Sequence, residues 1–102
     1  MPLKDFKDSP IAKDLQDPDF AAEYLEEALA EDFQNFIIAL RNVADANGGL
    51  GQLAQFSNLG RESLYKTLCA NGSSSPYFST IHQILDALGM KLSIQAKDGD
   101  DL

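Results

Sequence analysis

Apolar residues recur with a helical period along most of this chain of 102 residues. Asp17 followed by Pro18 is typical of a helix start, and we expect the first long helix to run to about Ala30. Asp32 predicts the cap of a second helix, which Asn47-Gly48-Gly49 is expected to end. The apolar stripes expected to face the core are Phe20, Ala21, Tyr24, Leu25, Ala28 and Leu29 in the first helix, and Phe33, Phe36, Ile37, Leu40, Val43 and Ala44 in the second.

Residues 50–68 predict two short helices joined by a tight turn. Their apolar faces are Leu50, Leu53 and Ala54 in the first helix, and Leu64 and Leu68 in the second. In the turn, Asn58 can adopt the left-handed backbone conformation, and Leu59 is expected to enter the core. The arrangement is typical of a helix-turn-helix, whose second helix lies exposed for insertion into a groove of DNA. An ordinary helical hairpin with the same spacing is the alternative.

The C-terminal third predicts a last helix followed by a strand. Ser79 or Thr80 is expected to cap the helix, and Gly89 is expected to end it. From Met90 to Ala96 apolar and polar residues alternate, which is the period of a β-strand. We expect this strand to pair with a second copy of itself in a homodimer; pairing with the N-terminal segment is the alternative.

The predicted fold is an all-α helix-turn-helix domain of five helices with a short C-terminal β-strand. We expect a single domain over residues 1–102, with its helical core at 18–96. The sequence leaves open whether residues 1–17 are ordered without a partner. Residues 97–102 form an acidic tail.

Composition and charge fit a small folded domain with two different surfaces. Hydrophobic residues make up 44% of the chain, and no apolar run approaches the ~20 residues that span a membrane. The net charge of −8 is divided unevenly, with −7 over residues 1–32, +2 over 33–97 and −3 over the remaining tail. A single cysteine and an N-terminus without an apolar leader favour the cytoplasm. Because cations are few, non-specific affinity for DNA is expected to be poor.

The residues expected to contact DNA are Arg61, Glu62, Ser63 and Lys66 on the second helix of the motif, Gln52 on the first, and Ser75 in the polar loop that follows. Arg61 has the side chain best suited to bidentate contact with guanine; the alternative is a surface ion pair with Glu62 or Asp45. Glu62 would repel phosphates unless it accepts a hydrogen bond from a cytosine amino group. The alternative is that its negative charge stabilises the positive N-terminal end of its own helix. Plain solvent-exposed positions are the alternative for the rest. Tyr65 is expected to pack in the core.

No catalytic or cofactor site is expected. Cys69 has no histidine placed to activate it, and His82 has no second histidine or cysteine nearby with which to bind zinc. The acidic residues around Glu26 and Glu31 lack the apolar pocket that general acid–base chemistry requires. We therefore predict a binding protein rather than an enzyme, with no metal and no cofactor.

A set of residues between about Tyr24 and Ile94 carries a family resemblance: Ala39-Leu40, Gly48-Gly49, Leu53-Ala54, Leu59, Arg61 to Leu68, Pro76, Phe78, Thr80 and Ala87-Leu88-Gly89. In these residues the chain resembles the helix-turn-helix antidote (antitoxin) proteins of bacterial addiction modules, HigA-like relatives of the phage-repressor type of DNA-binding domain. The resemblance implies a repressor-like dimer that binds a palindromic operator and represses its own operon. It also implies that the protein neutralises a small basic RNA-cleaving toxin of the RelE/HigB-like type, and it places Arg61, Glu62, Ser63 and Lys66 toward DNA.

Three features depart from the family pattern. Asn58 replaces the usual glycine of the turn, which asparagine tolerates because it accepts a positive φ. Gly60 replaces the serine that caps the second helix. The loop at 72–76 is longer than usual, which leaves its expected phosphate contacts open.

The acidic N-terminal segment is expected to bind the toxin through Glu23, Glu26, Glu27 and Glu31, which would compete with RNA phosphates for the toxin's cationic site. Two other functions stay open: a stand-alone transcriptional repressor, and a protein-interaction module that does not bind DNA. The sequence does not give the operator, the identity of the toxin, the geometry of the dimer, or whether the toxin acts as a co-repressor.

Overall fold

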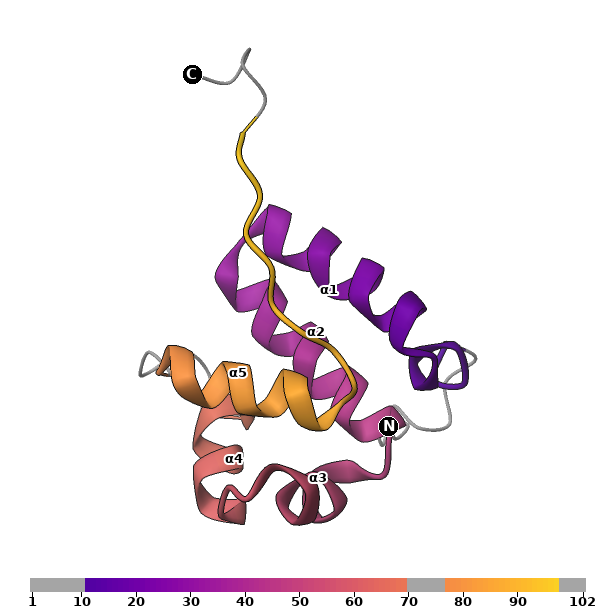
Figure 1. Ribbon diagram of the computed structural model, residues 1–102. Coiled ribbons are helices and arrows are strands. Elements are labelled where there is room, and N and C mark those ends of the chain that lie inside the picture. The colour runs from indigo at the N-terminus through magenta and orange to yellow at the C-terminus, as the bar shows by residue number, and fades with distance from the viewer. Residues whose placement is uncertain (1–10, 70–76, 98–102) are drawn as a thin grey trace.

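The computed structural model describes residues 11–69 and 77–97, and these residues are helical for most of their length (Figure 1). The helices are α1 (Pro18–Glu31), α2 (Phe33–Ala46), α3 (Gly49–Ser57), α4 (Arg61–Cys69) and α5 (Phe78–Ala87), preceded by the short 3-10 helix η2 (Asp14–Gln16). Figure 1 shows α1 and α2 side by side, with α3, α4 and α5 grouped at the other end of the molecule. The predicted all-α class is confirmed for this part of the chain.

Two aspartates cap the long helices as predicted. The Asp17 carboxylate accepts a hydrogen bond from the Asp19 N–H at 3.0 Å, and Pro18 occupies the first position of α1. The Asp32 carboxylate accepts from the Asn35 N–H at 2.7 Å at the start of α2. Each cap satisfies an amide that has no partner inside its helix, so these boundaries follow from local sequence.

The glycine stop after α2 is confirmed, and it has a steric reason. Gly48 has a φ of 108°, and a β-carbon there would lie 2.9 Å from the side chain of Gln52. The chain can therefore turn from α2 into α3 only with glycine at this position.

The predicted start of α5 is wrong, although its end is confirmed. The helix begins at Phe78 rather than after Ser79 or Thr80. Tyr77 is the N-cap, because its carbonyl oxygen accepts from the N–H groups of Thr80 and Ile81 at 3.1 and 3.2 Å. No side chain caps this end, so the expected hydroxyl cap is replaced by a backbone carbonyl. At the other end the stop at Gly89 holds, with a φ of 86°.

The core joins all five helices and η2. Its buried apolar residues are Ala12, Leu15, Ala21, Leu25, Phe36, Ala39, Leu40, Val43, Ala44, Ala46, Leu53, Leu64, Leu68, Ile81, Ile84 and Leu85. Three residues of the predicted stripes lie outside it, since Phe20, Leu29 and Phe33 are 38%, 51% and 44% exposed. Ala39 and Ala46 are buried as well, so the buried face of α2 extends to one side of the predicted stripe.

Residues ahead of α1 also pack against the helices. Leu15 in η2 is only 1% exposed. The side-chain amide of Asn47 donates to the carbonyl of Leu15 at 3.1 Å, and the amide of Gln16 donates to the carbonyl of Ala46 at 3.1 Å. These bonds tie η2 to the C-terminal end of α2.

The strand predicted at Met90–Ala96 is not formed by the single chain. Met90 packs partly against the core, but Leu92 is 39% and Ile94 is 99% exposed, and in Figure 1 the segment passes in front of α2 and then extends beyond the helices. A strand requires backbone partners on a neighbouring strand, and the helices around it offer no free edge.

Candidate nucleic-acid interface

The turn between α3 and α4 has the predicted geometry. Asn58 has a φ of 61° and a ψ of 18°, in the left-handed region. The Ser57 hydroxyl, which is buried, accepts from the Leu59 N–H at 3.2 Å, and Leu59 is half-buried against the core. The chain therefore reverses direction between two helices that share one apolar seam, as a helix-turn-helix requires.

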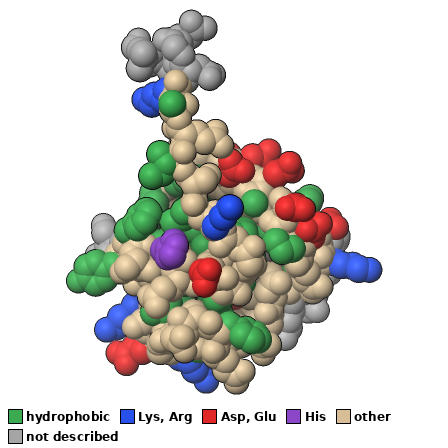
Figure 2. Space-filling view, viewed as in Figure 1, with side chains coloured by type: hydrophobic (Ala, Val, Ile, Leu, Met, Phe, Trp, Pro, Cys, Tyr) green, Lys and Arg blue, Asp and Glu red, His purple; other side chains and the backbone are tan. Residues whose placement is uncertain are grey.

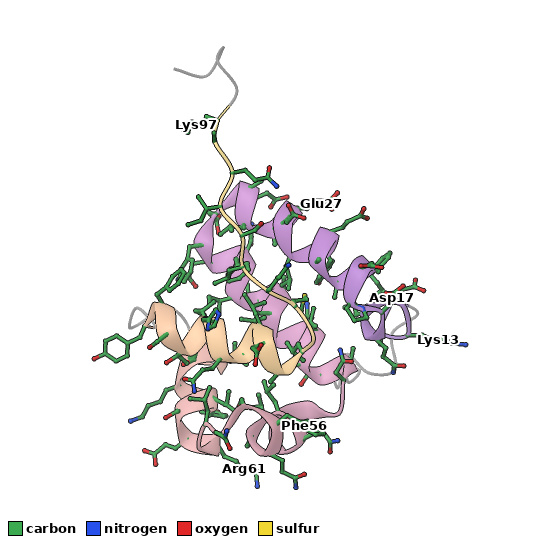
Figure 3. All side chains as sticks on the ribbon, in the orientation of Figure 1. Lys13, Asp17, Glu27, Phe56, Arg61 and Lys97 are labelled. Carbon is green, nitrogen blue, oxygen red and sulfur yellow. The ribbon has the colours of Figure 1, made fainter. Side chains whose placement is uncertain are left out.

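One side of α4 is fixed in the core, and the other side is exposed. Leu64 and Leu68 are 0% and 3% exposed. Arg61, Glu62, Ser63 and Lys66 are all exposed. Figure 3 shows Arg61 pointing away from the body of the molecule at the end where α3 meets α4. The structure thus brings these four predicted residues together on one accessible helix, with Arg61 at its first position, where recognition helices approach base edges.

The charges on α4 are only weakly engaged. The Lys66 ammonium lies 3.5 Å from the Glu62 carboxylate, and these side chains are 72% and 85% exposed. A solvated pair of this kind contributes little to stability, so Lys66 can exchange Glu62 for a phosphate at small cost. Glu62 thus pairs with Lys66 rather than with Arg61, and Arg61 makes no ion pair with any residue in the described ranges. Both cations are available to an anionic partner.

The other two predicted DNA contacts lie outside α4. Gln52 is exposed on α3, where it lines a small depression of about 140 Å³ with Phe56, Ala87 and Leu88. Ser75 lies outside the described residues.

Tyr65, expected in the core, is 62% exposed. It follows the buried Leu64 by a single residue, a rotation of about 100° that carries it out of the apolar seam. This aromatic ring is therefore part of the accessible surface of α4, contrary to the prediction. The sequence could have indicated this exposure, because Tyr65 directly follows Leu64 and does not share the helix face of Leu64 and Leu68.

The acidic residues occupy a second surface at the other end of the molecule. Glu23, Glu26, Glu27 and Glu31 are all exposed on α1, and Figure 2 shows acidic side chains gathered over that helix. Figure 3 shows Glu27 and Arg61 at opposite ends. A partner on α1 and a partner on α4 would therefore not compete for the same surface.

The described residues show no arrangement typical of a metal site, since nowhere among them do three or more histidine, cysteine, aspartate or glutamate side chains gather. His82 is exposed. Among the helices of the described ranges, none has the length and apolar content to cross a bilayer.

Comparison with protein families matches residues 5–96 to a family described as "Probable addiction module antidote protein". The match covers nearly the whole chain. Neither the curated proteins nor the solved structures that were compared gave a match.

Proposed function

Because this chain belongs to the family of probable addiction module antidote proteins, we propose that it binds and neutralises a small basic ribonuclease toxin of the RelE/HigB-like type and represses its own operon. In this proposal it acts as a homodimer on a palindromic operator. It works by occupying surfaces on the toxin and on DNA, not by catalysis.

The exposed side of α4 is the observation that carries the DNA-binding part of the proposal. Buried Leu64 and Leu68 anchor the helix in the core, while Arg61, Ser63 and Lys66 remain accessible. Arginine at the start of such a helix can contact guanine in a bidentate manner, which discriminates by ~1–3 kcal/mol. Lys66, five residues further on, is suited to a backbone phosphate.

The C-terminal segment supports the dimer. Its alternating residues leave Leu92 and Ile94 exposed, with no strand beside them in the described chain. Pairing two such segments would satisfy the backbone groups along their shared edge and bring the apolar residues of both onto one face of the ribbon. To read a palindromic operator, the two α4 helices of such a dimer must lie about one DNA turn, ~34 Å, apart.

A mobility-shift titration with the chain's own promoter tests DNA binding. The double variant Arg61→Ala, Lys66→Ala is expected to weaken binding at least about tenfold. The matched control Lys13→Ala, Arg41→Ala removes the same charge from exposed positions outside α4, and it should change affinity far less. Equal losses in both double variants would mean that net charge, not α4, governs binding.

A protein-interaction module without DNA binding is the second candidate, favoured by the net charge of −8 and by Glu62 on the exposed side of α4. Co-purification with the product of the neighbouring reading frame tests whether the chain binds a toxin. Retention of that protein without any promoter shift would establish this second candidate. A promoter shift without a co-purifying partner would instead indicate a stand-alone repressor.

A further inference from the structure

A shallow groove runs between α1 and α2, on the acidic side of the molecule. It has a volume of about 260 Å³ and is lined by Tyr24, Glu27, Ala28 and Glu31 from α1 and by Asn35, Ile38 and Ala39 from α2. For comparison, a cavity of ~150 Å³ accommodates a benzene molecule. The groove is thus large enough to receive one long side chain of a partner.

Hydrogen bonds between the two helices hold the walls of the groove in place. The Asn42 side-chain amide donates to the Tyr24 hydroxyl at 3.0 Å. At the other end, the Asn35 amide donates to the Glu31 carboxylate at 2.8 Å. Both bonds join α1 to α2 at or beside the groove, so its shape is preformed and little ordering is required on binding.

The lining of the groove is apolar below and acidic at the rim. Ala28 and Ala39 are small, which leaves the hollow, and Ile38 is 54% exposed beside them. Ile38 lies outside the apolar stripe of α2, on the side where polar residues are expected. Ile38 is therefore an exposed aliphatic side chain that does not belong to the core of the protein.

The rim carries negative charge that no described residue neutralises. Glu27 and Glu31 are one helical turn apart, and neither forms an ion pair within the described ranges. They occupy the last turns of α1, where no basic residue is present and where the helix dipole is itself negative. Like charges four residues apart on a helix disfavour each other, so a cation from outside would relieve both repulsions.

From this combination we propose that the groove between α1 and α2 binds an arginine side chain on the basic surface of the toxin, an inference that rests on the proposed function. The aliphatic part of the arginine lies along Ala28 and Ile38, and its guanidinium group pairs with Glu27 and Glu31. Arginine fits better than lysine because its planar group can contact two carboxylate oxygens at once and is more easily desolvated. The toxin contact thus includes Glu27 and Glu31 but not Glu26.

The position of Glu26 provides a matched control. Glu26 and Glu27 are both exposed on α1, but only Glu27 lines the groove. Glu27→Gln and Glu26→Gln remove the same charge from neighbouring residues of the same helix. The full chain and these two variants, together with Ile38→Ser, are to be titrated by calorimetry with the product of the neighbouring reading frame. Urea unfolding of each variant alone verifies that it is folded.

We expect Glu27→Gln and Ile38→Ser each to weaken binding about tenfold, and Glu26→Gln to change it less than about twofold. The free energy of unfolding should not fall in Glu27→Gln, because a repulsion is removed. In a double-mutant cycle with the exposed arginines of the toxin, one arginine should couple to Glu27 and not to Glu26. Equal effects of Glu26→Gln and Glu27→Gln, with the wild-type chain still binding, would overturn the groove but leave the proposed function. Absence of any binding by the wild-type chain would overturn both the groove and the toxin-binding part of the proposed function.

Discussion

Asn58 holds a left-handed conformation, with a φ of 61°, in the turn on which the orientation of α4 depends. That conformation costs an ordinary residue with a β-carbon ~1 kcal/mol or more, and glycine almost nothing. We expect Asn58→Ala to lower the free energy of unfolding by about 1 kcal/mol and Asn58→Gly to leave it nearly unchanged. Urea unfolding followed by circular dichroism measures both values. Equal losses would point to a contact of the asparagine side chain instead of the backbone conformation.

Leucine-to-alanine substitutions at Leu15 and Leu29 compare the stability lost at a buried site with that lost at an exposed site. Leu15 is 1% exposed in η2, whereas Leu29 is 51% exposed on α1. Leu15→Ala should leave a cavity and lower the free energy of unfolding by ~2–5 kcal/mol, and Leu29→Ala should lower it by less than ~1 kcal/mol. The comparison is made by urea unfolding. A small loss for Leu15→Ala would show that η2 contributes little to the core.

At the scale of the element, α4 begins without a side chain to cap it. The Gly60 carbonyl accepts from the Leu64 N–H at 3.1 Å, and no atom lies within 4 Å of where a β-carbon would stand at Gly60. Gly60→Ser should add a hydroxyl acceptor for the first turn and raise stability by roughly 0.5 kcal/mol. The melting temperature should rise accordingly. Gly60→Ala lacks the acceptor. An equal rise of the melting temperature in that variant would show that the gain comes from a lower conformational entropy of the unfolded chain and not from the cap.

At the scale of the whole molecule, the proposed dimer depends on the C-terminal segment. Ile94 and Gln95 are neighbours on opposite sides of the predicted strand, and Ile94 is 99% exposed in the single chain. Ile94→Asp should convert a dimer into a monomer, because it places charge in the apolar contact. Gln95→Asp carries a similar charge change on the polar side and should remain dimeric. Sedimentation velocity distinguishes these outcomes, and a dimer in both variants would place the subunit contact elsewhere.

Much of the fold could be predicted because its signals are local. Asp17, Asp32, Gly48 and Gly89 act on the backbone within a few residues of themselves, so their sequence positions sufficed to set helix boundaries. The N-cap of α5 could not be found in this way, because a backbone carbonyl at Tyr77, not a side chain, receives the first hydrogen bonds.

Burial at the edges of a helix could not be predicted from period alone. Phe20, Leu29 and Phe33 fit the spacing of their stripes but lie beyond the contact surface, while Ala39 is buried where α2 approaches α1. Tyr65 is exposed because the buried side of α4 is narrow and includes Leu64 and Leu68 but not the neighbouring position 65. The width of each contact depends on how neighbouring helices cross, and that is not a local property.

The sequence by itself determined the helices, the turn at Asn58 and the separation of acidic from basic regions, since each depends on residues close together in the chain. Only the tertiary structure decided which acidic residues share a surface. It placed Glu27 and Glu31 beside Ile38 of another helix and left Glu26 apart, because a groove exists only where two packed helices meet.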